Sequence, residues 1–371
     1  QQMINELYSN GYEWQDEEGE EHGETETSVN GVKREGKDEE DKRITISDPQ
    51  YKPPKHRHNM SKDIYKDHYR AAEATELRKL HDKGFIEYWS EEKYQTHLEQ
   101  GGNKAVPFRW AYNVKMSKQD LGRVDIFKAR LALRGDLQKD DFEPHEKYAP
   151  TASQEVIRTV TMIGLMHDMN HHQYDAPCAF LNAEPSKPTV CTPIPGYTIR
   201  DTRGRAMYPF LKKNLYGSVE AGKRWADVVK DFLLERGFTQ TITDPTVFVN
   251  KERKMTCVVY VDDFSLGFKE DRDRIWLEKE MSEAYEMKME GPIANYVGVR
   301  YTKTDRGYFM DQELRVRALA ARLGIKKGMN TRTPYKTVKP FGKLELDDHE
   351  ETRKELEKTY GFHLRNVIGE M

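Results

Sequence analysis

The chain has 371 residues, a formal net charge of −3 and a hydrophobic fraction of 36%, and its length allows two or three domains or one hand-shaped enzyme. Its three cysteines include no Cys-x-x-Cys pair, which argues against a disulfide framework or a cysteine zinc site and indicates a reducing intracellular compartment. No signal peptide and no apolar run of membrane length are present, so we expect no membrane partner. The chain starts at Gln1 and stops at Met371 inside an apolar segment, so we expect a piece of a longer polyprotein.

Charge is distributed unevenly along the chain. Residues 1–50 hold 15 acidic and 5 basic residues, a balance of −10, which leaves +7 for the rest. We predict that residues 1–50 are an acidic disordered linker, because they have too few aliphatic side chains to offset chain entropy. The mildly basic remainder suits a polyanionic partner, although composition alone favours an ordinary surface with a few extra lysines.

The first predicted element is a helix over residues 61–83, which contain neither proline nor glycine. Ser61 could cap its start, and Gly84 would end it. We interpret it as a packing helix.

A β-hairpin follows. Residues 108–115 and 125–134 alternate as strands, with Gly122 near the turn between them. On the second strand Lys128, Arg130 and Arg134 are separated by even numbers and share one face. Such a row of cations could bind a triphosphate, or it could simply guard a solvated edge strand.

A helix and a short strand come next. Residues 153–169 are apolar at helical spacing, and the predicted buried stripe is Val156, Val160, Ile163 and Leu165 or Met166. The strand that follows ends at Asp175, with Phe180 five residues further on.

A longer helix is predicted to end at Arg236, before Gly237. Its buried stripe is Trp225, Val229, Phe232 and Leu233. Gly217 precedes this helix, where it could allow close approach of a ligand to the backbone or could simply start the helix.

Two adjacent acids, Asp262 and Asp263, separate the apolar runs 255–261 and 264–268. We predict two buried strands with the acids at the turn between them. Buried carboxylates side by side repel each other and need a counter-charge, for which oxygen ligands favour Mg²⁺ or Mn²⁺. An ordinary exposed Asp-Asp turn is the alternative, but Asp175 offers the further carboxylate that two-metal phosphoryl transfer needs.

The last predicted elements are a helix over residues 271–287, a strand over 296–301 and a basic helix over 314–323. The first helix would bury Leu277, Met281, Ala284 and Tyr285, and Lys288 follows it. The basic helix carries Arg315, Arg317 and Arg322, which would face solvent or a nucleic-acid backbone.

Several motifs agree in order and spacing with one known family. They are Lys128–Gly135, Tyr148–Pro150, Asp175–Asn182, Leu215–Gly217 with Trp225, Asp244–Pro245, Tyr260–Asp263, and Met287–Lys288 followed by Tyr296–Gly298. From about Trp110 onward, with a fainter match back to Met60, the chain resembles the reverse transcriptase of copia-type LTR retrotransposons, part of a Gag-Pol polyprotein.

The resemblance implies an α+β right-hand polymerase whose antiparallel palm sheet is backed by helices. Fingers and palm would occupy residues 51–305. The fingers would be residues 61–150 and 184–216, and the palm residues 151–183 and 217–305. Residues 306–371 would form a partial thumb or connection, truncated before an RNase H domain.

The resemblance also implies the catalytic residues Asp175, Asp262 and Asp263. With the backbone carbonyl of Ala176 they would bind two Mg²⁺ ions, for which Mn²⁺ can substitute. Asp175 and Asp262 would bridge both ions, and Asp263 would support them.

Nucleotide and primer contacts are implied in the same way. Nucleotide contacts would come from Lys128, Arg130, Phe180, Tyr216, Gly217 and Lys288. Phe180 would exclude ribonucleotides by a clash at C2′, unless it is a core aromatic, and Lys288 would protonate pyrophosphate, unless it is a surface lysine. Primer and template contacts would come from Tyr260, Val261, Tyr296 and Gly298.

The implied partners are an RNA template, a DNA primer and dNTPs, with integrase upstream and RNase H downstream in the polyprotein. The implied location is the cytoplasm, inside virus-like particles, with the nucleus reached later. Family members commonly read Leu-Lys-Gln-Ala-Pro-Arg where this chain has Ser218–Lys223, and Lys-Thr where it has Pro177-Cys178. The alternatives are therefore a decayed or domesticated nucleic-acid-binding module, or a segment that folds only inside its polyprotein.

Overall fold

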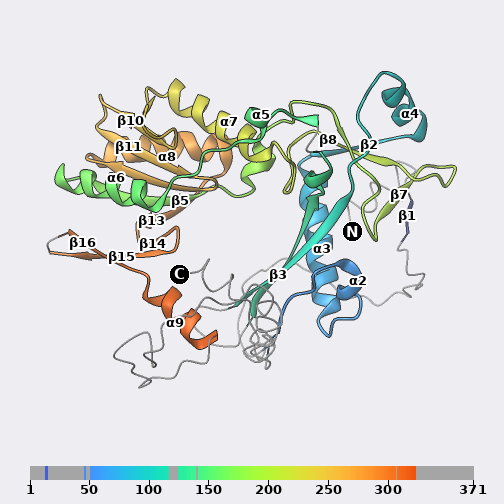
Figure 1. Ribbon diagram of the computed structural model, residues 1–371, viewed down its shortest axis with the longest axis horizontal. Helices are drawn as coiled ribbons and strands as arrows, with labels where there is room; N and C mark the ends of the chain where they lie inside the picture. The colour runs from blue at the N-terminus through green and yellow to red at the C-terminus, as the bar shows by residue number, and fades with distance from the viewer. Residues whose placement is uncertain are drawn as a thin grey trace, which may run out of the picture.

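The computed structural model describes residues 13–15, 46, 51–116, 124–138, 141–305 and 307–322, and Figure 1 labels its elements. The helices are α2 (Arg57–Met60), α3 (Lys66–Asp82), α4 (Glu91–Glu99), α5 (Pro144–Lys147), α6 (Gln154–Met166), α7 (Ala221–Glu235), α8 (Asp271–Tyr285) and α9 (Glu313–Arg322), with 3-10 turns η1 (Gly135–Leu137) and η3 (Ala179–Asn182). The strands are β1 (Glu13–Gln15), β2 (Ile86–Trp89), β3 (Phe108–Met116), β4 (Val124–Leu133), β5 (Asn170–Asp175), β6 (Thr189–Val190), β7 (Thr198–Arg200), β8 (Tyr208–Leu211), β9 (Thr239–Gln240), β10 (Val247–Asn250), β11 (Met255–Tyr260), β12 (Asp263–Phe268), β13 (Lys288–Pro292), β14 (Asn295–Tyr296), β15 (Val299–Thr304) and β16 (Gly307–Asp311). No helix within the described ranges is both long enough and apolar enough to cross a membrane.

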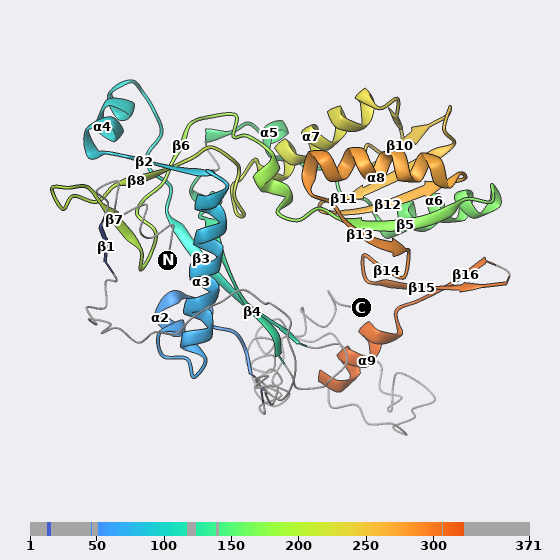
Figure 2. The ribbon, with the colours of Figure 1, turned by 180° about the vertical axis from the view of Figure 1, so that it is seen from behind.

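Six antiparallel strands form the central sheet, in the order β13-β5-β12-β11-β10-β9. Because side chains alternate along a strand, Met255 and Cys257 of β11 pack with α7 and α8, whereas Val258 packs with α6. Helices therefore cover both faces of the sheet (Figures 1 and 2). The fold is a mixture of helices and antiparallel sheet, as predicted.

A second unit has its own core. It consists of α3, the β3–β4 hairpin and the three-stranded sheet β2-β8-β6. The hairpin and α3 run side by side and extend away from the central sheet (Figures 1 and 2). A third small sheet, β14-β15-β16, follows β13 and leads into α9.

Most local predictions are confirmed. β3 and β4 pair as an antiparallel hairpin, although Gly122 lies outside the described residues. Asp262 lies in the turn between β11 and β12, as predicted, and Asp175 ends β5, whereas Asp263 is not in the turn but is the first residue of β12 and pairs with Tyr260. The buried stripe of α7 is as predicted, because an amphipathic pattern of period 3.6 has one face to bury.

The predicted helix over residues 61–83 is divided in two. Ser61 does not cap a helix start; it ends α2, and its hydroxyl donates to the His58 carbonyl at 3.0 Å. The Asp63 carboxylate accepts the Tyr65 N–H at 2.8 Å, a local turn that competes with helix formation, so α3 begins only at Lys66.

Two predicted helix faces are partly wrong. In α6, Ile163 and Met166 are 48% and 78% exposed, whereas Thr161 and Gly164 are buried. Small side chains there allow α6 to approach the sheet closely. In α8, Ala284 is exposed, and Glu278 is buried because its carboxylate accepts hydrogen bonds from Tyr174 and Arg274.

Part of the predicted disordered linker has structure. Residues 13–15 form β1, which pairs with β7, and Ile46 is buried. A strand can be held by backbone hydrogen bonds without a large apolar surface of its own. The other residues of 1–50, and residues 323–371 of the predicted partial thumb, lie outside the described ranges.

Candidate active site

Three acidic residues lie at one end of the central sheet, which we call the acidic edge (Asp175, Asp262 and Asp263). Asp263 lies directly opposite Asp175 in the pairing of β12 with β5. Lys288 lies opposite Asp175 on its other side, in the pairing of β13 with β5. Residues directly opposite each other in antiparallel strands share a face, with Cβ atoms about 5 Å apart. The sheet register therefore places the side chains of Asp263, Asp175 and Lys288 side by side on three neighbouring strands.

Asp262 stands in a tight turn. The turn consists of Val261 and Asp262, since Tyr260 pairs with Asp263. Val261 has a φ of 56°, a strained conformation for a β-branched residue. Two hydrogen bonds hold the turn: Trp225 Nε1 donates to the Val261 carbonyl at 2.7 Å, and the Ala176 N–H donates to the Asp262 carbonyl at 2.7 Å.

The acidic edge carries negative charge that Lys288 and Lys128 offset only in part. Burial raises the pKa of Asp175, and the charges of Asp262 and Glu290 raise it further. Burial, together with Asp262, Asp175 and Glu290, raises the pKa of Asp263 to about 6. Within the described part of the chain, no three carboxylate, imidazole or thiol groups stand close enough together to enclose an ion. The donor chemistry fits a hard divalent cation, because oxygen ligands whose charges oppose one another are what such an ion stabilises.

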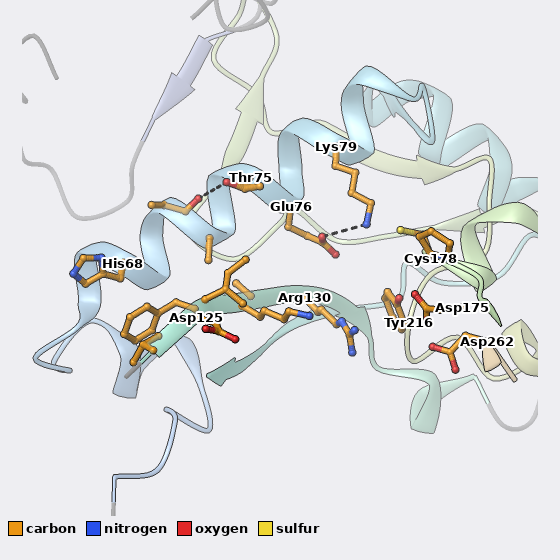
Figure 3. Close-up of a pocket in the computed structure, with 18 of the residues that line it drawn as sticks. His68, Thr75, Glu76, Lys79, Asp125, Arg130, Asp175, Cys178, Tyr216 and Asp262 are labelled. Carbon is orange, nitrogen blue, oxygen red and sulfur yellow. Dashed lines mark hydrogen bonds and ion pairs between the residues drawn. The ribbon is translucent and has the colours of Figure 1, made fainter. Parts of the chain in front are cut away.

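An open cavity of about 760 Å³ extends from the acidic edge (Figure 3). Its walls come from α3, β4, the segment after β5, Tyr216 and Asp262. Asp175 and Asp262 lie at one end, His68 lies at the other, and Arg130 lies between them (Figure 3). The cavity is thus lined by two carboxylates at one end and by the side chains of Lys79, Lys128 and Arg130 along its walls.

Two of the three predicted triphosphate-binding cations line this cavity. Lys128 and Arg130 both contribute to the β4 wall, and the charge of Lys128 lowers the pKa of Asp175. Arg134 does not line the cavity, because β4 ends at Leu133 and the Arg134 guanidinium pairs with Asp136 at 2.6 Å.

The side chains of Arg130, Tyr216 and Phe180 form a stack. The Arg130 guanidinium lies 4.8 Å from the centre of the Tyr216 ring, and the Phe180 ring meets the Tyr216 ring edge to face at 5.4 Å. Tyr216 lines the cavity, whereas Phe180 is behind it and also packs against the core of the central sheet. The stack links the cationic wall to the predicted sugar-discriminating ring.

Gly217 is required by contact between backbones. Its φ is +82°, and a Cβ on it would lie 2.3 Å from the Leu133 carbonyl oxygen. Gly135 is required for the same close approach, because a Cβ on it would lie 2.0 Å from the Gly217 carbonyl oxygen. Gly217 itself does not line the cavity. The two glycines bring the end of β4 against the segment that carries Tyr216.

The predicted primer-side residues lie beyond the acidic edge. Tyr260 is half-buried beside the turn. Tyr296 is only 2% exposed, and its hydroxyl lies 3.2 Å from the Asp263 carbonyl oxygen, so the side chain supports the acidic edge from below and is not placed to touch a primer. Gly298 has a φ of +79°, and a Cβ there would lie 3.3 Å from Arg315 Nη1 of α9. The backbone of this turn and the basic helix therefore lie close together.

Sequence reasoning missed two groups of residues. Thr75, Glu76 and Lys79 of α3 line the cavity, although α3 was predicted only to pack. Glu290 adds a fourth carboxylate beside the acidic edge, at a β-bulge in β13. No local pattern in the sequence marks the three residues of α3. Glu290 could have been found, because it follows Lys288 by two residues, and in a predicted strand two such residues lie on the same face.

The altered stretch 218–223 is well accommodated. Glu220 is 2% exposed, and its carboxylate accepts hydrogen bonds from the Ser186 N–H at 2.9 Å and the Ser186 hydroxyl at 2.6 Å. Lys223 pairs with Asp227 one turn along α7. Glu220 therefore holds the loop that contains Ser186 in place through these two hydrogen bonds.

Comparisons with known proteins identify the family of this chain. Residues 92–336 match the family described as reverse transcriptase (RNA-dependent DNA polymerase). The chain is 24% identical over 238 residues to the retrovirus-related Pol polyprotein from transposon TNT 1-94 of Nicotiana tabacum, covering 63% of this chain and 18% of that protein. It is 24% identical over 243 residues to the Pol polyprotein from transposon RE1 of Arabidopsis thaliana, covering 65% and 16%.

The chain thus spans less than a fifth of these curated relatives. Among solved structures, it is similar to telomerase from Candida albicans in complex with a TWJ fragment of telomeric RNA. The TM-score is 0.36 and the identity 9%, over 66% of this chain and 50% of that one.

Proposed function

Because the chain belongs to the reverse transcriptase (RNA-dependent DNA polymerase) family of LTR retrotransposons, we propose that it copies RNA into DNA by template-directed nucleotidyl transfer. The primer 3′-hydroxyl would attack the α-phosphate of a dNTP, and pyrophosphate would leave. One observation carries the proposal: Asp175, at the end of β5, and Asp262, in the turn between β11 and β12, both line one end of a cavity whose wall holds Lys128 and Arg130.

In this proposal the central sheet with α6, α7 and α8 is the palm. The unit of α3 and the β3–β4 hairpin is the fingers, and β16 with α9 begins the thumb. The cavity then lies between fingers and palm, where a nucleotide would bind.

Asp175 and Asp262, supported by Asp263 and the Ala176 carbonyl, would hold two Mg²⁺ ions, or Mn²⁺ in their place. These ions would supply a lower pKa for the attacking hydroxyl and charge neutralisation for the leaving pyrophosphate. The Trp225 and Ala176 hydrogen bonds fix the turn that presents Asp262, so the chain itself orients this carboxylate before substrate binds.

The other cavity residues would orient the nucleotide. Lys128 and Arg130 would bind the triphosphate, and Tyr216 would lie beneath the sugar. Phe180, which packs against Tyr216 from outside the cavity, would hold that ring in place so that a 2′-hydroxyl is excluded. Lys288 is exposed and lies opposite Asp175, with Nζ 3.4 Å from Glu290, where it could donate a proton to pyrophosphate.

Beyond the nucleotide, the proposed partners are an RNA template and a DNA primer, with integrase and RNase H as neighbouring polyprotein domains. Arg315, near the turn at Gly298, would contact the nucleic-acid backbone. The proposed site of action is a cytoplasmic virus-like particle, before entry to the nucleus.

Primer extension on poly(rA)/oligo(dT) with Mg²⁺ or Mn²⁺ tests the proposal. The parent chain is compared with Asp262→Asn and with Asp271→Asn, a control at an exposed acid that begins α8. We expect extension by the parent and the control and none by Asp262→Asn. Binding of primer–template without extension by the parent would favour the decayed module, and neither binding nor extension would favour a fragment that needs its polyprotein.

A further inference from the structure

Gln173 makes three hydrogen bonds with one amide group. It lies on β5, two residues before Asp175 and on the same face of the sheet, and it is 8% exposed. Its Nε2 donates to Glu290 Oε2. Its Oε1 accepts the N–H groups of Ala294 at 3.0 Å and Asn295 at 3.2 Å.

All three partners belong to the segment that leads from β13 into β14. That segment ends at the β14–β15 turn (Val297 and Gly298), because Tyr296 pairs with Val299. Gln173 therefore joins the strand that carries Asp175 to the chain that reaches this turn.

The turn has further anchors on the same side. The Tyr296 hydroxyl lies within hydrogen-bonding distance of the Asp263 carbonyl oxygen, and Gln154 Nε2 of α6 donates to the Val297 carbonyl at 2.6 Å. Val297 has a φ of 45°, so the turn is strained and needs such support. The backbone also holds the start of this segment to β5, because β13 pairs with β5 and the Ile293 N–H donates to the His171 carbonyl at 2.9 Å. Beyond Ile293, within the described residues, Gln173 provides the side-chain hydrogen bonds between β5 and residues 294–298.

We infer that Gln173 is a positioning residue, which fixes the β14–β15 turn relative to Asp175 and so aligns the primer 3′-end with the attacked phosphate. The inference rests on the proposed function, in which this turn faces the primer. An amide is needed because the site requires a donor toward a carboxylate and an acceptor toward two N–H groups at the same time. Glutamate would repel Glu290, and methionine of similar length would leave the Glu290 carboxylate and the N–H groups of Ala294 and Asn295 without this partner.

A packing role alone would predict lower stability without a specific kinetic effect. A positioning role predicts a slower chemical step with unchanged nucleotide binding, because a displacement of about 1 Å costs on the order of 100-fold in rate. The two roles can therefore be separated by the split between maximal rate and KM.

The test uses the full chain with saturating primer–template, varies dNTP, and compares Gln173→Met with Gln240→Met. Gln240 lies on β9, at the opposite edge of the same sheet, and its Nε2 donates to the Pro245 carbonyl. We expect Gln173→Met to lower the maximal incorporation rate at least about tenfold, with the KM for dNTP within about twofold of the parent. Equal rates in the two variants, after correction for folded fraction, would overturn the inference.

Amide hydrogen exchange of residues 294–299 gives a second readout that needs no activity. We expect faster exchange in Gln173→Met and parent-like exchange in Gln240→Met. Should Gln173→Met fail to fold, the exposed Glu290 provides a matched pair, since Glu290→Gln keeps an acceptor for Gln173 and Glu290→Ala does not. Faster amide exchange of residues 294–299 in Glu290→Ala, but not in Glu290→Gln, would support the inference that Gln173 holds this segment. Equal exchange in the two variants would overturn it.

The two failures are distinguishable. A parent chain without primer extension defeats the proposed function, while hydrogen exchange still decides whether Gln173 holds the segment. An active parent with unchanged exchange and rate in the variants defeats the inference alone.

Discussion

The indole N–H of Trp225 donates a hydrogen bond to the carbonyl of Val261, at 2.7 Å. Trp225 is 1% exposed in α7, so a helix on one face of the central sheet holds the turn that presents Asp262. The bond matters because Val261 is in a left-handed conformation that valine rarely adopts, and the surroundings must maintain it.

Replacing Trp225 with phenylalanine is therefore expected to loosen this turn. The ring volume is mostly kept, but the partly buried Val261 carbonyl loses its donor, which costs about 1 kcal/mol of unfolding free energy. We expect primer extension to fall by roughly tenfold, because Asp262 is no longer held in place. Denaturant unfolding and single-nucleotide incorporation measure the two effects. Trp276→Phe is the control, since Trp276 stacks with Arg253 far from the turn, and an equal loss of activity there would contradict the prediction.

Neutralising Asp263 is expected to stabilise the metal-free protein. Burial and the charges of Asp262 and Asp175 raise the pKa of Asp263 to about 6, above the value of about 4 in an unfolded chain. An acid shifted in this direction makes the fold less stable as the pH rises between these values. Asp263→Asn should therefore melt higher than the parent at pH 8 without divalent cations, with the difference disappearing near pH 4.

The same carboxylate gives a direct test of cation binding. Mg²⁺ is expected to raise the melting temperature of the parent at pH 8 more than that of Asp263→Asn, because the cation relieves the repulsion that the variant lacks. Asp271→Asn should respond like the parent. An equal rise in melting temperature of all three proteins with Mg²⁺ would show that the cation does not bind at the acidic edge.

A buried histidine is expected to make the fold acid-sensitive. His171 is 2% exposed, its Nε2 has no hydrogen-bond partner among the described residues, and burial together with His172 lowers its pKa to about 4. A histidine with a lowered pKa leaves the fold intact above pH 6.5 and destabilises it as the pH falls toward 4, by about 3 kcal/mol in full. We expect His171→Leu to flatten the pH dependence of unfolding free energy over this range. His167→Gln, at the exposed end of α6, should keep the slope of the parent.

Sugar discrimination is expected to depend on both rings of the stack. Phe180→Val removes the ring that supports Tyr216, so ribonucleotides should gain incorporation efficiency relative to dNTPs. Tyr216→Phe keeps the ring and should retain the discrimination of the parent. The measurement is the ratio of incorporation efficiencies for a matched dNTP and rNTP, and an unchanged ratio in Phe180→Val would show that this ring is no gate.

The sequence predicts the parts of the site that depend on local pattern. A short segment that ends in an acid predicts the strand end at Asp175, and two apolar runs around two acids predict a hairpin with Asp262 in its turn. The buried stripe of α7 follows from its period in the same way. These features need only neighbouring residues to specify them.

What the sequence does not predict depends on contacts between distant segments. Glu76 and Lys79 enter the cavity wall because α3 packs beside β4, and nothing in the helix itself marks them. Glu290 lies at a β-bulge in β13, where one residue has no partner on β5. Such a bulge changes the direction of the side chain, and here it brings Glu290 beside the acidic edge. The exposed face of α6 was misjudged because His171 occupies the space beside Gly164, a partner that helical periodicity does not reveal.

The contact between Gly135 and Gly217 has a consequence for how such an element decays. Elsewhere a damaged side chain can be compensated by a second change nearby, but here two carbonyls occupy the space that any side chain would need. A copy that loses either glycine is therefore expected to separate the end of β4 from the segment that carries Tyr216, and no substitution of a neighbouring side chain can restore that contact between backbones.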